Sequence, residues 1–208
     1  MAPWAVGHSV VIGCFRCQTT GRHLGGTLTI EQVSELPASA LARLAEIDRT
    51  EHVTAAYRTV GQGLQRYSVD WHIKAWDESQ IAAFKTALTA ELEVGGSYLA
   101  VEVSGRLAGV AVLGNRRLGL SSALAELRFL HVSAEHRGHG IGTRLVEAAV
   151  ERARRSGADG MYISATRTAP TVDFYLARGA FLAVPPDAER LAQEPVDIHL
   201  VLWWRSPT

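Results

Sequence analysis

The segment HRGHGIGTRL, residues 136–145, constrains this chain more than any other feature. It places glycines at 138, 140 and 142 between an apolar run and a segment whose apolar residues have helical spacing. Glycine disfavours strands and helices, but it allows positive φ angles and a close approach of the backbone to a ligand. The first amides of a helix attract anions, because they have no partner within the helix. The segment therefore predicts a phosphate-binding turn; the alternative is a glycine-rich turn without a ligand.

The spacing of the glycines separates the families that use such a turn. A dinucleotide-binding fingerprint starting at Gly138 and Gly140 would need a third glycine where Thr143 stands. A Walker loop needs a lysine, and the segment contains none. The remaining pattern is Arg/Gln-x-x-Gly-x-Gly/Ala, which Arg137, Gly140 and Gly142 satisfy. With this pattern, the sequence resembles the GNAT superfamily of acyl-CoA-dependent N-acyltransferases.

The resemblance extends from ELRFLHV at residue 126 to GAF at residue 181, about 55 residues. It implies an α/β fold, with a mixed central sheet flanked by helices and a parallel strand pair that splays apart. It also implies that acetyl-CoA is the acetyl donor, its pyrophosphate bound at the glycine turn and its pantetheine beside the splayed strand. The cofactor-binding residues that follow are Leu130, His131, Val132, Arg137, Gly138, His139, Gly140, Ile141, Gly142, Thr143 and Thr168.

The same resemblance implies two catalytic side chains. Glu126 opens the strand that enters the splay, where family members with a carboxylate base have a glutamate. It would deprotonate the amine directly or through water, and an ordinary surface glutamate is the alternative. Tyr175 matches the phenol that acts as general acid toward the thiolate, and a half-buried core tyrosine is the alternative. The backbone N–H of Val132 would meet the oxyanion. Thr168 and Thr171 depart from the usual Asn and Ala.

Hydrophobic periodicity predicts most elements along the chain. We expect strands at 26–33, 97–103, 107–114, 126–132, 160–165, 180–184 and 197–204, and helices at 37–47, 77–94, 143–157 and 171–179. Residues 48–76 read as short helical pieces broken by GQG, followed by an aromatic-rich segment. The last strand, with its HLVLWW run, could pair across a homodimer or be internal.

Composition excludes some functions and sets the domain organisation. The 208 residues carry 21 Lys and Arg against 21 Asp and Glu, which argues against a nucleic-acid partner. No apolar run approaches the roughly 20 residues of a membrane helix, and we expect a cytoplasmic protein. We expect residues 1–24 to form an N-terminal arm and residues 25–208 to form a single domain. Cys14 and Cys17 in that arm read as an incidental reduced pair, with a zinc or redox site as the alternative.

The acceptor site is the least determined part of the prediction. In the family the acceptor lies between the first helices and the splay, so residues 46–76 should line its site. Asp48, Glu51 and Trp71 in this segment suit a cationic amine such as an amino sugar, and a solvated face with core aromatics is the alternative. A small-molecule amine is the expected substrate; a protein amino group and a non-catalytic acyl-CoA sensor stay open. The histidines at 131, 136 and 139 lack a metal-binding spacing, so we expect no metal there.

Overall fold

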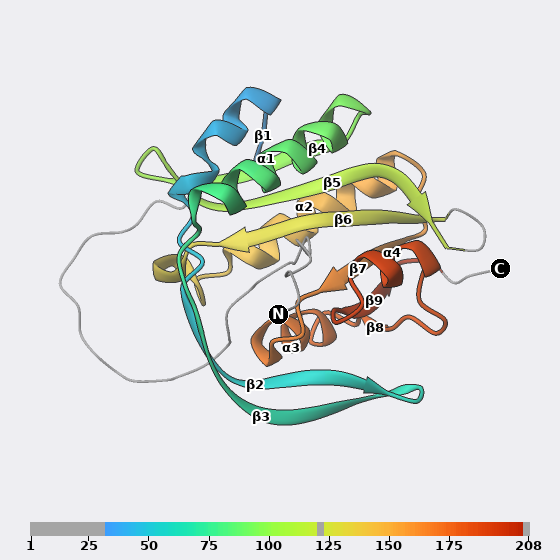
Figure 1. The fold of residues 1–208 in the computed structure, drawn as a ribbon. Helices are drawn as coiled ribbons and strands as arrows, with labels where there is room; N and C mark the ends of the chain where they lie inside the picture. Colours follow the sequence, from blue (N-terminus) through green and yellow to red (C-terminus); the bar gives the residue numbers. More distant parts are fainter. Residues whose placement is uncertain (1–31, 120–122, 206–208) are drawn as a thin grey trace.

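The computed structural model describes residues 32–119 and 123–205. Two layers of helices enclose one large sheet, and a two-stranded hairpin projects from it (Figure 1). The N-terminal arm, its two cysteines and most of the first expected strand lie outside the described residues. In chain order the elements are β1 Ser34–Leu36, η1 Ala38–Glu46, β2 Glu51–Val60, β3 Gly63–Ile73, α1 Glu78–Glu93, β4 Ser97–Val103, β5 Arg106–Leu118, β6 Leu124–Val132, η2 Ala134–His136, α2 Ile141–Arg155, β7 Gly160–Ala165, α3 Ala169–Leu176, β8 Phe181–Leu182, α4 Ala188–Gln193 and β9 Ile198–Trp203.

The main sheet has the strand order β1-β4-β5-β6-β7-β9-β8, and only its β6–β7 pair is parallel. Alternate residues of the strands face opposite layers, as strand geometry requires. Ala111 packs in the core under α2 and α3, whereas Val110 and Val112 pack under η1 and α1. Strand β9 lies between β7 and β8, so it is an internal strand. The expected mixed α/β sheet flanked by helices is confirmed.

The parallel strands β6 and β7 pair over only part of their length. Their register runs from Leu124 opposite Gly160 to Leu127 opposite Ile163, and β6 then continues to Val132 without a β7 partner. The segment at 128–132 therefore has its β7-facing edge open, which is the splay that the resemblance implies.

A β-bulge marks the point where the two strands separate. The β5 residues Val112 and Leu113 pair with Phe129 and Leu127, so Arg128 is an extra residue in β6. An inserted residue bends its strand and increases the local twist. The bulge therefore directs the end of β6 away from β7.

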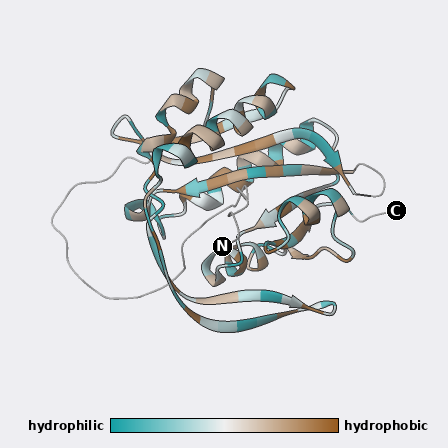
Figure 2. Ribbon diagram, viewed as in Figure 1, coloured by the Kyte–Doolittle hydropathy of each residue, from teal (hydrophilic) through white to brown (hydrophobic). Residues whose placement is uncertain are grey.

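The prediction of helical pieces in residues 48–76 is wrong. This segment forms a long antiparallel hairpin from β2 and β3. The turn lies at Gly61–Gln62, within the GQG that was expected to separate helical pieces. Tyr67, Val69, Trp71 and Ile73 alternate with polar residues, which is a strand period of two. In Figure 2 the hairpin alternates between hydrophilic and hydrophobic residues, whereas β5 has long hydrophobic stretches.

The remaining elements follow the sequence closely, with three differences. Helix α1 begins after Asp77, whose carboxylate accepts from the Gln80 amide in a capping box. The segment at 37–47 is a 3-10 helix, β5 extends through Leu118 into the expected connection, and the short helix α4 was not expected. Across the described part of the chain, no helix has the length and apolar character to cross a membrane.

Candidate active site

The glycine turn has the backbone geometry of an anion cradle. Gly138 and Gly140 have φ angles of 79° and 83°, which favour glycine, and a Cβ atom at either position would meet nothing within 4 Å. Gly140 caps α2, and the Arg144 amide donates to its carbonyl over 3.1 Å. The amides of residues 141–143 therefore precede the hydrogen-bond ladder of the helix, and the helix dipole adds partial positive charge there. This end of α2 can bind a phosphate group.

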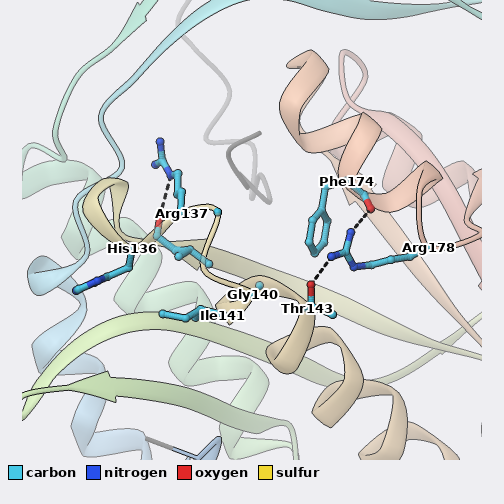
Figure 3. A pocket seen from close by; sticks show the side chains of 10 residues that line it. His136, Arg137, Gly140, Ile141, Thr143, Phe174 and Arg178 are labelled. Atoms are coloured by element: carbon cyan, nitrogen blue, oxygen red, sulfur yellow. Dashed lines mark hydrogen bonds between the residues drawn. The ribbon is translucent and has the colours of Figure 1, made fainter. Parts of the chain in front are cut away.

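A shallow cavity lies at the glycine turn, and α3 with the residues after it forms the opposite wall (Figure 3). Arg178 lines this cavity with its guanidinium 3.4 Å from the centre of the Phe174 ring. It also donates to the Thr143 hydroxyl and, over 2.6 Å, to the Phe174 carbonyl. Sequence reasoning missed both Arg178 and Phe174. Their spacing of four on a helical segment beside Tyr175 was the available signal.

Arg137 points away from the amides of the cradle. Its Nε donates to the Val132 carbonyl over 3.0 Å (Figure 3), and its Nη1 donates to the Thr50 carbonyl over 2.8 Å. These bonds tie the turn to the end of β6 and to the start of the hairpin. We therefore interpret Arg137 as a residue that positions the turn.

The end of β6 presents its open edge beside the cradle. Leu130 and Val132 are buried in the core under α2 and α3, whereas His131 is buried on the opposite face, 4.9 Å from Trp76 and 4.5 Å from Phe129 between ring centres. The side chains of these β6 residues are therefore occupied by packing. Their backbone amides and carbonyls on the β7-facing edge are the groups that can meet a ligand.

Tyr175 is fully buried on α3, in the same core cluster as Leu130 and Val132. Its hydroxyl has no hydrogen-bond partner among the residues that the structure describes. Burial raises the pKa of the Tyr175 phenol well above its ordinary value, so the group holds its proton. A buried hydroxyl without a partner is costly, typically about 1–3 kcal/mol. A ligand that accepts from this hydroxyl would remove the cost.

Glu126 lies at the centre of a buried ion-pair network. Its Oε1 is 2.8 Å from Arg128 Nη1 and 2.7 Å from Arg190 Nε, and its Oε2 accepts from Arg190 Nη2 over 3.0 Å. Arg128 also pairs with Glu91 over 2.8 Å. Burial raises the pKa of the Glu126 carboxyl, and the two guanidinium groups oppose that rise. Both carboxylate oxygens are thus engaged, which favours a role through water over direct contact with an amine.

A second cavity, of about 420 Å³, lies between the hairpin and the segment from β8 to β9. Arg167, in its wall, stacks over the Trp71 ring at 4.9 Å. Burial lowers the pKa of His199, which keeps this wall residue neutral. The residues that line the cavity include Tyr57, Thr59, Arg167, Leu182, Val196 and His199.

The other residues predicted for the site lie outside both cavities. Thr168 is buried as the N-cap of α3, and its hydroxyl donates to that of Thr171 over 2.9 Å. The Asp48 carboxylate accepts from the amide and hydroxyl of Thr50. His139 is exposed on the glycine turn, and the half-buried Glu51 lies near Arg137. Trp71 supports the wall of the second cavity through Arg167 without lining it.

The architecture described above is that of an acyl-CoA-dependent transferase, with a splayed parallel pair and a glycine cradle at the start of a helix. The model of the acetyltransferase (GNAT) family matches residues 61–180, more than half of the chain. The chain belongs to this family, and it is an acetyl-CoA-dependent acetyltransferase. A search of curated proteins finds no match.

Solved structures with the same fold differ widely in their named substrates. A nourseothricin acetyltransferase has a TM-score of 0.61 at 18% identity, covering 83% of this chain and 97% of that one. PaiA N-acetyltransferase from Thermoplasma acidophilum, solved with coenzyme A, has a TM-score of 0.54 at 16% identity over 85% and 100%. Ribosomal-protein-alanine N-acetyltransferase from Brucella melitensis has a TM-score of 0.53 at 17% identity over 83% and 99%. At these identities the likeness concerns the fold.

We expect the Arg178 guanidinium to contribute measurably to the affinity for coenzyme A. Replacing Arg178 with methionine keeps much of the apolar stem but removes the positive charge beside the cradle. We expect the Kd for coenzyme A, measured by calorimetry, to rise about 10-fold, because a charged hydrogen bond contributes about 1.5–3 kcal/mol. Arg155→Met, near the other end of α2, is the control and should leave the Kd unchanged. An equal effect of both substitutions would contradict a local role for Arg178.

Proposed function

We propose that this enzyme transfers the acetyl group of acetyl-CoA to the primary amine of a small molecule, by direct attack in a ternary complex. An amino-sugar antibiotic of the aminoglycoside type is the acceptor class that we favour. The cavity between the hairpin and the β8–β9 segment carries this proposal, because its volume is in the range of small-molecule sites. The fold shared with a nourseothricin acetyltransferase supports the same choice.

The residues of the glycine turn fit the donor. The amides at 141–143 and the Arg178 guanidinium would hold the pyrophosphate, and the open edge of β6 would pair with the pantetheine amides. Bound in this way, acetyl-CoA supplies an activated thioester. The Val132 amide would stabilise the oxyanion, because backbone N–H groups need no reorganisation to meet developing charge.

Glu126 and Tyr175 would carry out the two proton transfers of the reaction, from the amine and to the thiolate. A primary amine is mostly protonated at neutral pH, so it must lose a proton before it can attack. We assign this step to Glu126 acting through water, since Arg128 and Arg190 occupy its carboxylate. The Tyr175 phenol holds its proton and has no partner among the described residues, so it is suited to protonate the leaving thiolate.

The walls of the second cavity carry polar groups and would suit an acceptor rich in hydrogen-bonding groups. Tyr57 donates to Asp173 over 2.8 Å, and the neutral His199 imidazole adds no positive charge. The guanidinium groups of Arg58 and Arg167 are stacked on the rings of Tyr67 and Trp71, which fixes the positions of these two cations. Asp197 contributes a carboxylate to the same wall. An acceptor with several amine and hydroxyl groups would therefore meet charges of both signs and hydrogen-bonding groups in this cavity.

Thiol release from acetyl-CoA tests the proposed acceptor class. We expect rapid release with nourseothricin or aminoglycosides and slow release with peptides that begin with alanine. Faster turnover of the peptides would assign a protein amino group as the acceptor. Binding of acetyl-CoA without turnover of any amine would mean that the chain is a sensor.

Filling the second cavity tests the acceptor site itself. We expect Thr59→Trp to raise the KM for the amine about 10-fold and to leave the KM for acetyl-CoA unchanged, because steric changes in a site cost about 1–3 kcal/mol. Val60→Trp is the matched control, since Val60 is adjacent, exposed and outside the cavity. An unchanged amine KM in Thr59→Trp would move the acceptor site elsewhere.

A further inference from the structure

Two histidines and an aspartate gather on one exposed face of the hairpin, away from both cavities. His52 on β2 and His72 on β3 are directly opposite each other in the antiparallel register. Asp70 lies two residues before His72 on β3, so its side chain is on the same face. The side chains of His52, His72 and Asp70 are 53%, 72% and 80% exposed. The backbone ladder thus holds the two histidines opposite each other, and Asp70 lies on the same face at an irregularity in the ladder.

The three side chains converge on a common point. Asp70 Oδ1 is 2.7 Å from His52 Nε2 and 3.8 Å from His72 Nε2. The imidazole rings are stacked in parallel with their centres 4.4 Å apart. One ligand atom from each of the three residues lies within 4.8 Å of the others. Zinc bonds to nitrogen and oxygen are about 2.0–2.2 Å long, which places neighbouring ligand atoms of a tetrahedral site about 3.3 Å apart. The distance from Asp70 Oδ1 to His52 Nε2 is shorter than this ligand separation, and the distance to His72 Nε2 is longer.

We propose that His52, Asp70 and His72 form a binding site for a divalent transition-metal ion of the zinc class. Two imidazole nitrogens and one carboxylate oxygen are ligands that zinc prefers, and water from the exposed side would complete the coordination. An oxygen-seeking cation such as Mg²⁺ is disfavoured, because two of the three ligands are nitrogen. The site is separate from the acetyl-transfer residues, so its role is structural or regulatory.

The position of the site gives the metal a physical effect. A two-stranded hairpin is marginally stable by itself, and here the bridge between Ala56 and Thr168 and the bond from the Tyr57 amide to the Arg167 carbonyl tie it to the domain. A metal that joins β2 to β3 would hold the strands in register near one end of the hairpin, whose other end contributes to the wall of the second cavity. Because binding requires the folded hairpin, the metal would also stabilise the folded protein.

Zinc titration by calorimetry tests the site on the full chain. Both cysteines are first replaced, as Cys14→Ser and Cys17→Ser, because those thiols could bind zinc by themselves. In this parent we expect one zinc ion per chain and a thermal midpoint that rises with added zinc. Absence of zinc binding in the parent would overturn the proposal.

Substitution of the ligands identifies where the zinc binds. In the same parent we expect His72→Gln and the isosteric Asp70→Asn each to weaken zinc binding about 100-fold, since even groups around the ligands contribute 10- to 100-fold. Circular dichroism checks that both variants keep the fold. His136→Gln is the matched control, because His136 has one carboxylate neighbour, Glu135, at 3.4 Å. Unchanged affinity in both ligand variants, or an equal loss in the control, would overturn the assignment.

Discussion

Replacing Tyr175 with phenylalanine is expected to lower kcat by about 100- to 10,000-fold, the usual contribution of a positioned general acid. The substitution removes one buried oxygen and keeps the ring that packs against the core under α2 and α3. The Kd for coenzyme A should change little, because the cradle at the start of α2 is untouched. The free energy of unfolding should stay the same or rise, since the removed hydroxyl has no partner among the described residues. Steady-state kinetics, calorimetry and thermal unfolding of the same preparation give all three quantities.

Tyr98 supplies the control for this substitution. Its side chain is 1% exposed in the core under η1 and α1, and its hydroxyl also lacks a partner in the described part of the chain. Burial raises the pKa of this phenol as it does for Tyr175. Tyr98→Phe should therefore keep full activity. Wild-type kcat in Tyr175→Phe would remove the general-acid role, and equal losses in both variants would indicate a general effect of hydroxyl deletion.

Replacing Gly140 with alanine is expected to weaken coenzyme A binding about 100-fold, equivalent to about 2.7 kcal/mol. A Cβ at this position meets no protein atom within 4 Å, so it would project into the space beside the amides of the cradle. The φ angle of 83° is also unfavourable for alanine, by about 1–2 kcal/mol. The first effect reduces affinity for the donor, whereas the second reduces the stability of the fold. Calorimetry measures the former and thermal unfolding the latter.

Gly157 separates these two effects, because it lies just beyond the other end of α2. Its φ angle is 82°, and a Cβ there also meets nothing within 4 Å. Gly157→Ala should therefore lose about as much stability as Gly140→Ala but keep the affinity of the wild type for coenzyme A. If both variants lose affinity equally, the backbone strain and not the cradle is responsible.

The C-terminal half of the fold was predictable from local patterns. The glycine spacing after ELRFLHV and the helical period of residues 143–157 depend on neighbours in the sequence, and β6, α2 and β7 appear within a few residues of their expected bounds. The hairpin was missed although Tyr67 to Ile73 alternate strictly, because the glycines and mixed residues around 48–66 suggested breaks. In addition, β2 and β3 pair only with each other and not with a strand of the main sheet.

The charge environment of the site could not be read from the sequence. Glu126 is visible as a glutamate at the start of a strand, but its contact with Arg190 spans 64 residues and depends on α4, a helix too short to predict. The spacing of Arg178 from Phe174 was visible in the sequence, but the contact of Arg178 with Thr143 across the cavity was not. Such contacts between distant segments depend on the tertiary fold. Whether Glu126 acts as the base therefore stays a prediction that the kinetics of Glu126→Gln would test.

The hairpin stands outside the seven-stranded sheet (Figure 1), although it forms one wall of the second cavity. Its residues contribute little to the two large cores, so changes along β2 and β3 leave the donor-binding framework intact. If the amine binds as we propose, selection could reshape this arm for a new acceptor while the seven-stranded sheet stays the same. Residues 51–73 would then be the segment to exchange in an engineered enzyme.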